Sequence, residues 1–361
     1  MQPLEVHPQI EKAETIHTDF YLNPARFRES KEKIFARSWQ LIGDTDQVKD
    51  PGWCTPVNLL PEYLNEPLIL SRDKENNIHC LRNVCTNRGN LLVEKPCRVN
   101  DIRCKYHGRR FGLDGKFTSM PEFKEVENFP TDADNLHRLK TLQWGKWIFT
   151  TLNDSISEED FFEPMRSRLN WLPLQDFHFR PELSRDYKVE ANWALYCENY
   201  LEGFHIPFVH AGLNSVIDYS NYTTETFKYS SLQLGIGKDN DFTFDLPPTS
   251  PDYGKRVAAY YFWIFPSMMF NFYPWGCSVN IVKPKSPSSC LVKFLTYVWN
   301  EDKLRQGVGA DLHQVEMEDE DIVQQVQKGI RSRFYTKGRY SVKRETGTHH
   351  FHRLIAEFLS R

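Results

Sequence analysis

The chain lacks the features that mark several specialised classes of protein. Its 361 residues include 45 Lys and Arg against 48 Asp and Glu, so the net charge is only −3. General binding to nucleic acid needs a basic excess, and we therefore expect no nucleic-acid partner. Gly and Pro number 18 and 21, which is too few for a fibrous or disordered chain. The first residues show no basic segment followed by an apolar one, so we expect no secretory signal and a cytoplasmic location.

The sequence also lacks a long uninterrupted apolar run, and its mean hydropathy is −0.58. Residues 257–275 have about the length of a membrane span, but Pro266, Asn271 and Pro274 interrupt them and about half of them are aromatic. Aromatic segments between turn residues are typical of buried strands. We therefore expect strands here and no membrane partner.

Aromatic residues and cysteines, by contrast, are well represented. Phe, Tyr and Trp number 25, 16 and 9, and such side chains build large cores or line apolar pockets. The 8 cysteines are not needed as disulfide staples in a chain of this length, so we expect reduced thiols. A cluster of reduced cysteines more often serves a metal or catalysis.

The spacing of turn signals predicts three segments. Residues 1–38 contain an amphipathic helical stretch and are expected to form an arm that packs on the last segment. Residues 39–150 consist of short runs separated by turns such as DKENN and LDGK, which predicts a small all-β domain. Residues 151–361 mix helices, expected around 311–335 and at the C-terminus, with strands over 224–300. The predicted fold class is α+β, with the all-β domain inserted near the start of the larger one.

A first motif combines two cysteines with one histidine. NVCTNRGN (83–90) contains Cys85, and CKYHG (104–108) contains Cys104 and His107. Thiolates suit iron–sulfur chemistry or zinc, and Gly89 and Gly108 would let the backbone approach a metal group closely. A zinc ribbon needs four Cys or His ligands, whereas only three are present here.

A second motif lies in NWALYCENYLEGFHIPFVH (192–210), which contains His205 and His210. On a helix, Glu198, Leu201, Glu202 and His205 would share one face. Pro207 is expected to bend this helix and so return His210 toward His205. An isolated pair of this kind would be surface or capping residues, but two histidines plus one carboxylate make the facial triad of non-haem Fe(II) oxygenases.

The carboxylate is predicted in VEMEDEDIVQQVQKGI (315–330). Asp319 lies within an apolar helical stripe that comprises Val315, Ile322, Val323, Val326 and Ile330. An unpaired buried carboxylate is costly, so Asp319 is expected to bind a metal ion. Glu318 flanks the stripe and is expected to support a metal ligand, whereas Asp321 should face solvent.

These segments resemble the Rieske non-haem iron oxygenase α-subunits of the ring-hydroxylating oxygenase family. The family's [2Fe–2S] loops read C-x-H and C-x2-H, and CKYHGRRFGLDG is similar to the second loop. The first loop is similar too, except that Asn87 stands where the family has a histidine. Residues 192–210 resemble the mononuclear-iron segment, and Glu318–Gln327 the segment with the third ligand. The similarity runs from SWQLIG to HHFHRLI.

The resemblance implies a Rieske domain inserted in a helix-grip (START-like) catalytic domain with an antiparallel sheet. It assigns the [2Fe–2S] cluster to Cys85, Asn87, Cys104 and His107, and mononuclear Fe(II) to His205, His210 and Asp319. It makes Glu202 the bridge to the cluster of the neighbouring subunit in a homotrimer. Glu202, in place of the usual Asp, is typical of the choline and carnitine oxygenase branch, which favours a quaternary ammonium substrate over an aromatic or other apolar one.

The implied activity is the O2-dependent hydroxylation of a small organic substrate by a mono- or dioxygenase. Electrons would come from NAD(P)H through a flavin and iron–sulfur reductase or a ferredoxin. Two other functions stay open: a catalytically disabled helix-grip protein that only binds a ligand, and an electron-transfer protein, which would have no use for Asp319.

Asn87 leaves several outcomes open for the cluster, because an amide is a poor iron ligand compared with an imidazole. The cluster could assemble with three good ligands and be unstable. The Asn87 oxygen, water or another residue could complete it, although His79 lies in a strand-like run and is not expected to do so. Alternatively, the cluster is lost and leaves zinc or nothing. We expect an impaired cluster.

Overall fold

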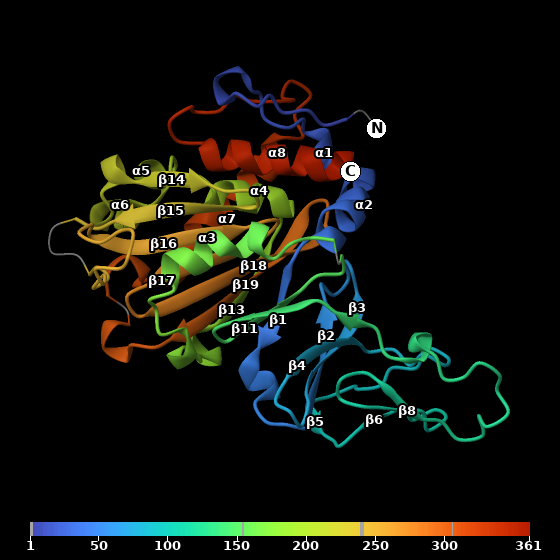
Figure 1. The fold of residues 1–361 in the computed structure, drawn as a ribbon. Helices are drawn as coiled ribbons and strands as arrows, with labels where there is room; N and C mark the ends of the chain where they lie inside the picture. Colours follow the sequence, from blue (N-terminus) through green and yellow to red (C-terminus); the bar gives the residue numbers. More distant parts are fainter. Residues whose placement is uncertain (1–2, 154, 239–241, 305) are drawn as a thin grey trace. The chain divides into compact units, whose positions relative to one another are not determined.

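The computed structural model describes residues 3–153, 155–238, 242–304 and 306–361 (Figure 1). They divide into two compact units. One comprises the chain up to Phe35 together with Ser157–Arg361, and the other is Ala36–Ile156. Within the described residues, no helix has the length and apolar character that crossing a membrane requires.

The Ala36–Ile156 unit is built from small antiparallel sheets. The largest has the order β5-β2-β3-β4-β9, and two three-stranded sheets have the orders β1-β11-β10 and β6-β7-β8. The predicted turns DKENN and LDGK join β3 to β4 and β7 to β8. The strands are β1 (Gln40–Asp44), β2 (Trp53–Leu59), β3 (Glu66–Arg72), β4 (Ile78–Arg82), β5 (Cys97–Arg98), β6 (Ile102–Arg103), β7 (Arg110–Phe111), β8 (Phe117–Ser119), β9 (Arg138–Leu139), β10 (Thr141–Trp144) and β11 (Trp147–Thr150).

The other unit is centred on a long antiparallel sheet of order β12-β19-β18-β17-β16-β15-β14, with β13 paired to β19. Residues 257–275 form two of its strands, as their composition predicts, and β16 to β18 are buried along nearly their whole length. The strands are β12 (His178–Phe179), β13 (Arg185–Val189), β14 (Thr223–Thr226), β15 (Ser230–Ile236), β16 (Val257–Ile264), β17 (Met268–Tyr273), β18 (Gly276–Ser286) and β19 (Ser289–Val298).

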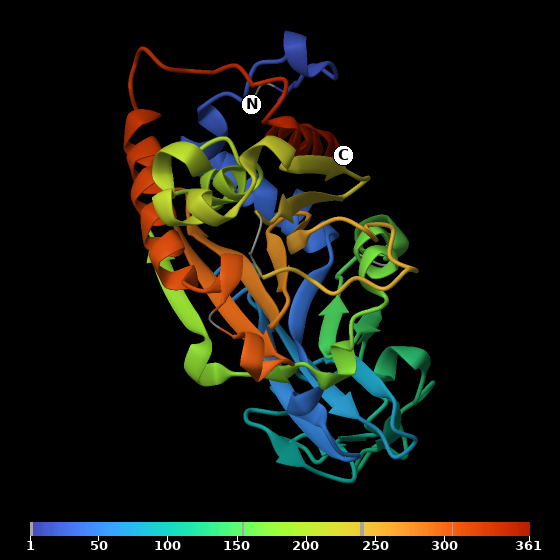
Figure 2. The same ribbon diagram turned by 90° about the vertical axis from the view of Figure 1, so that its left-hand side faces the viewer.

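Helices cover both faces of this sheet, which explains why its central strands are buried on both sides. Figure 2 shows α7 and the α4–α6 segment on one face and α3 on the other. The N-terminal helix α2 belongs to this unit, and the Lys33 ammonium donates a hydrogen bond to the Leu359 carbonyl of α8 at 2.6 Å. The helices are α1 (Asp19–Leu22), α2 (Pro24–Lys33), α3 (Glu159–Leu169), α4 (Trp193–Tyr200), α5 (Ile206–Val209), α6 (Ala211–Val216), α7 (Leu312–Gly329) and α8 (Thr346–Ser360).

Two local expectations are wrong. Helix α4 ends at Tyr200, so Glu202 and His205 lie in a turn and not on its face. Pro207 does not bend a continuous helix; it occupies the first turn of α5, where its missing N–H costs nothing. The turn, rather than a kink, allows both histidines to face the same point.

The buried face of α7 also differs from the predicted apolar stripe. Val326 is 43% exposed, and the buried positions are Glu316, Glu320, Val323 and Gln327. Asp319 lies beside this face with a side chain that is 18% exposed. The polar face is buried because it lies against α4 and the interior of the unit, where tertiary packing outweighs the hydrophobic pattern. Asp321 is exposed, as expected.

Candidate metal centre and cysteine loops

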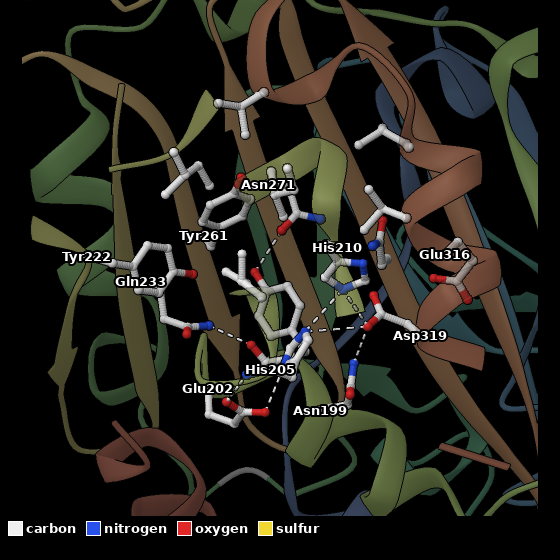
Figure 3. A pocket seen from close by; sticks show the side chains of 18 of the residues that line it. Asn199, Glu202, His205, His210, Tyr222, Gln233, Tyr261, Asn271, Glu316 and Asp319 are labelled. Carbon is white, nitrogen blue, oxygen red and sulfur yellow. Dashed lines mark hydrogen bonds and ion pairs between the residues drawn. The ribbon is translucent and has the colours of Figure 1, made fainter. Parts of the chain in front are cut away.

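Two histidines and one aspartate converge where α5, α6 and α7 meet (Figure 3). His210 Nε2 lies 3.2 Å from His205 Nε2 and 3.0 Å from Asp319 Oδ1, and His205 Nε2 lies 3.5 Å from Asp319 Oδ1. Ligand atoms about 2.1 Å from one metal ion, at right angles to one another, are about 3.0 Å apart. The three donor atoms therefore have the spacing that a single metal ion needs.

Each imidazole is fixed from behind by a carboxylate. His205 Nδ1 donates to Glu202 Oε1 and His210 Nδ1 donates to Glu318 Oε2, both at 2.7 Å. This arrangement sets the tautomer in which Nε2 is free to bind a metal. Glu202 is itself held by the backbone, because its other oxygen accepts from the amides of Phe204 and His205.

Asp319 has a further partner that sequence patterns alone do not predict. Asn199 Nδ2, on α4, donates to Asp319 Oδ1 at 2.6 Å and orients that carboxylate. Burial would lower the pKa of His210, but its hydrogen bonds and charge interactions with Asp319 and Glu318 outweigh burial and raise the pKa. A metal ion that binds His210 must displace its proton, so metal affinity should decrease as the pH falls.

The three residues that supply these donor atoms line a pocket whose wall is rich in tyrosine (Figure 3). Its polar wall includes Glu202, Glu316 and Asp319, and neither Lys nor Arg occurs among the described residues that line it. The five tyrosines of the wall are Tyr196, Tyr200, Tyr222, Tyr261 and Tyr273. Aromatic residues were expected to be mainly core; the pocket uses a few of them, nearly all tyrosines, which residue spacing could not identify.

The two cysteine loops of the Ala36–Ile156 unit have the same backbone design. The Gly89 amide donates to the Cys85 carbonyl and the Gly108 amide to the Cys104 carbonyl, both at 3.0 Å. Both glycines have a positive φ, 70° and 76°, which a side chain would strain. Both cysteines are buried in one hydrophobic cluster, and burial, with a smaller effect from Cys104, raises the pKa of the Cys85 thiol.

Asp134 ties the two loops together. Its carbonyl accepts from Thr86 of the first loop at 2.8 Å, and its carboxylate accepts from Arg109 of the second at 2.6 Å. The Arg109 guanidinium lies over the rings of Phe111, Phe117 and Phe129. The scaffold of the loops is therefore complete, although one side chain differs from the family pattern.

The side chains at the loop tips supply three strong donors and one weak one. Cys85, Cys104 and His107 offer two thiols and an imidazole, and the His107 ring is exposed and stacked on Tyr106. Asn87 offers only an amide, whose nitrogen lies 3.7 Å from the sulfur of Met120. A Rieske centre takes two histidines on one iron, so this donor set is one imidazole short. His79 is engaged elsewhere, with Asp73 at 2.6 Å.

Comparisons with known proteins agree with both halves of this description. The family described as "Ring hydroxylating alpha subunit (catalytic domain)" matches residues 176–361, and "Rieske [2Fe-2S] domain" matches residues 38–130. The chain is similar to chloroplastic choline monooxygenase of Spinacia oleracea, with 28% identity over 96% of this chain and 79% of that protein. The carnitine monooxygenase oxygenase subunit of Escherichia coli is 25% identical over 96% and 94%.

Solved structures show the same fold at lower identity. The quaternary ammonium Rieske monooxygenase CntA in complex with L-carnitine has a TM-score of 0.76 and 24% identity, over 98% of this chain and 99% of that one. Naphthalene 1,2-dioxygenase with bound indole has a TM-score of 0.72 and 18% identity, over 98% and 94%. The resemblance and the fold class expected from the two motifs are confirmed. The domains imply a [2Fe–2S] cluster and a mononuclear iron, and the chain belongs to the ring-hydroxylating α-subunit family of Rieske oxygenases.

Proposed function

We propose that His205, His210 and Asp319 bind Fe(II), and that the chain hydroxylates a small quaternary ammonium compound with O2. The observation that carries this proposal is the triangle of three donor atoms, 3.0–3.5 Å apart, at the wall of a tyrosine-lined pocket. A bound Fe(II) ion with such ligands keeps open positions for O2. A protein that only binds ligands would have no use for this triangle.

The surrounding residues prepare the iron ligands. Glu202 and Glu318 hold the imidazoles so that both Nε2 atoms point at one position, and Asn199 does the same for the Asp319 carboxylate. In our proposal, Glu202 also reaches the cluster of the next subunit in a homotrimer. Phe204 and Phe208 are close to it in sequence, 42% and 80% exposed, and offer an apolar surface for a second copy.

The substrate class follows from the pocket and the relatives. Tyrosine faces attract cations, and a wall with carboxylates and without Lys or Arg favours a positively charged ligand. The choline and carnitine monooxygenases named above act on compounds that carry a quaternary ammonium group.

Electron delivery to the iron depends on the cluster loops, where Asn87 departs from the family pattern. Oxygenase components of the family need a reductase or a ferredoxin as electron donor. We propose that Asn87 leaves the cluster poorly ligated, so that electron delivery limits turnover while the iron site itself is intact. Substitution of Asn87 by histidine should then restore the missing donor without altering the loop scaffold.

Ligand binding tests the substrate class without depending on electron delivery. The Fe(II)-loaded full chain would be titrated anaerobically in a calorimeter with choline and with 3,3-dimethylbutan-1-ol, in which carbon replaces the charged nitrogen. We expect choline to bind about tenfold or more tightly. Equal binding of the two, or binding of neither, would contradict a quaternary ammonium substrate. His210→Ala, which removes an iron ligand, is the control for the role of iron.

A further inference from the structure

A buried acid in the pocket wall has no role in the iron site. Glu316 lies on α7, one turn before Asp319, and only 2% of it is exposed (Figure 3). Its Oε2 accepts a hydrogen bond of 2.5 Å from the Tyr196 hydroxyl on α4. Its Oε1 is buried and has no hydrogen-bond partner. Glu316 and Tyr196 both line the pocket. Buried carboxylate oxygens are nearly always paired, so an unpaired one that borders a pocket indicates a ligand.

The charges around Glu316 narrow down what that ligand is. The other two pocket carboxylates already have functions, Glu202 with His205 and Asp319 as an iron ligand of the proposed site. Among the described residues that line the pocket, no Lys or Arg faces Glu316. Burial raises the pKa of Glu316 well above its usual value, because an isolated charge there is unfavourable. A cation placed beside it would relieve that cost.

We propose that Glu316, held by Tyr196, is the anionic subsite that binds the cationic group of the substrate. This inference rests on the proposed function and assigns the cation selectivity of the pocket to one residue. A quaternary ammonium group has no N–H to donate, so it can be recognised only by charge and by aromatic faces. Tyr196 donates to one oxygen and fixes the carboxylate, and the other oxygen has no hydrogen-bond partner in the protein.

The chain supplies a matched control one turn further along α7. Glu320 is also buried, 9% exposed, its Oε1 also has no hydrogen-bond partner, and burial raises its pKa as well. It does not line the pocket. Glu320→Gln therefore reproduces the loss of a buried acid on the same helix without a change in the pocket wall.

Binding of choline and 3,3-dimethylbutan-1-ol to Fe(II)-loaded full-length variants tests the inference. Glu316→Gln keeps the size of the side chain and an oxygen for the Tyr196 hydroxyl. We expect it to weaken choline binding about tenfold or more and to leave the neutral alcohol unchanged. Tyr196→Phe should weaken choline less, and Glu320→Gln should leave both ligands unchanged. Thermal unfolding of each variant checks that it is folded.

The outcomes separate this inference from the substrate proposal. If the parent chain prefers choline and Glu316→Gln keeps that preference, Glu316 is structural and the inference is wrong, whereas the substrate class stands. If Glu320→Gln weakens choline as much as Glu316→Gln does, the effect belongs to the helix and not to the pocket, which also overturns the inference. If the parent chain binds neither ligand, the substrate class itself fails.

Discussion

At the residue scale, the proposed iron site depends on side chains that never touch the metal. Each histidine of the pair is bonded through Nδ1 to a carboxylate that lies close in sequence to a ligand, Glu202 before His205 and Glu318 before Asp319. The sequence allowed both carboxylates to be predicted, because a supporting acid is expected next to a metal motif. Asn199 and Glu316 were not predicted, because their partners come from another helix and no spacing rule connects them.

Removal of the Glu318 charge should weaken iron binding without the loss of a ligand. Glu318→Gln replaces the carboxylate that fixes His210, and such substitutions lower metal affinity about 10- to 100-fold. Anaerobic Fe(II) titration of the metal-free chain measures the effect. Asp321→Asn, at an exposed position of the same helix, is the control and should bind iron like the parent chain. An unchanged affinity in Glu318→Gln would show that the negative charge beside His210 does not matter.

At the element scale, the helices and strands were predictable and their faces were not. Strand composition identified residues 257–275 as sheet, and periodicity located α7 and α8. The hydrophobic periodicity of α7 predicted that Val326 is buried, but Val326 is exposed. Glu316 and Glu320 are buried instead. Functional sites bury polar groups against the local hydrophobic pattern. Apolar periodicity therefore fails to predict the buried face of a helix that lines a functional site.

The helix α8 contains a pH-sensitive residue. Burial lowers the pKa of His350 to about 4, with smaller effects from Arg353 and His349. His350 is therefore neutral in the folded chain, and its contribution to stability is complete above the unfolded pKa of about 6.5 and is lost as the pH falls toward 4. The unfolding free energy of the parent chain should decrease between pH 7 and pH 4. Up to about 3 kcal/mol of that decrease should be absent in His350→Gln. Urea denaturation at several pH values measures this, with the exposed His178→Gln as control. The same decrease in His350→Gln as in the parent would contradict this assignment.

At the scale of the whole molecule, the chain combines a complete site with an incomplete one. The proposed iron site has three donors, two supporting carboxylates and a pocket. The cysteine loops have their glycines, their buried thiols and their link through Asp134, but an amide where the second imidazole should be. Both motifs and the asparagine could be identified from the sequence. The intact scaffold around Asn87 could not, because the hydrogen bonds that Thr86 and Arg109 donate to Asp134 join segments far apart in the chain.

Metal and sulfide analysis of the Asn87→His variant tests whether this one asparagine impairs the cluster. The parent and the variant would be reconstituted anaerobically with iron and sulfide, and the iron, acid-labile sulfide and Rieske EPR signal of the reduced proteins would be compared. We expect the parent to bind mononuclear iron but to contain little sulfide and a weak EPR signal or none. Asn87→His should gain the full sulfide content and the signal, with the same mononuclear iron. A full Rieske signal in the parent chain, or none in Asn87→His, would contradict the account.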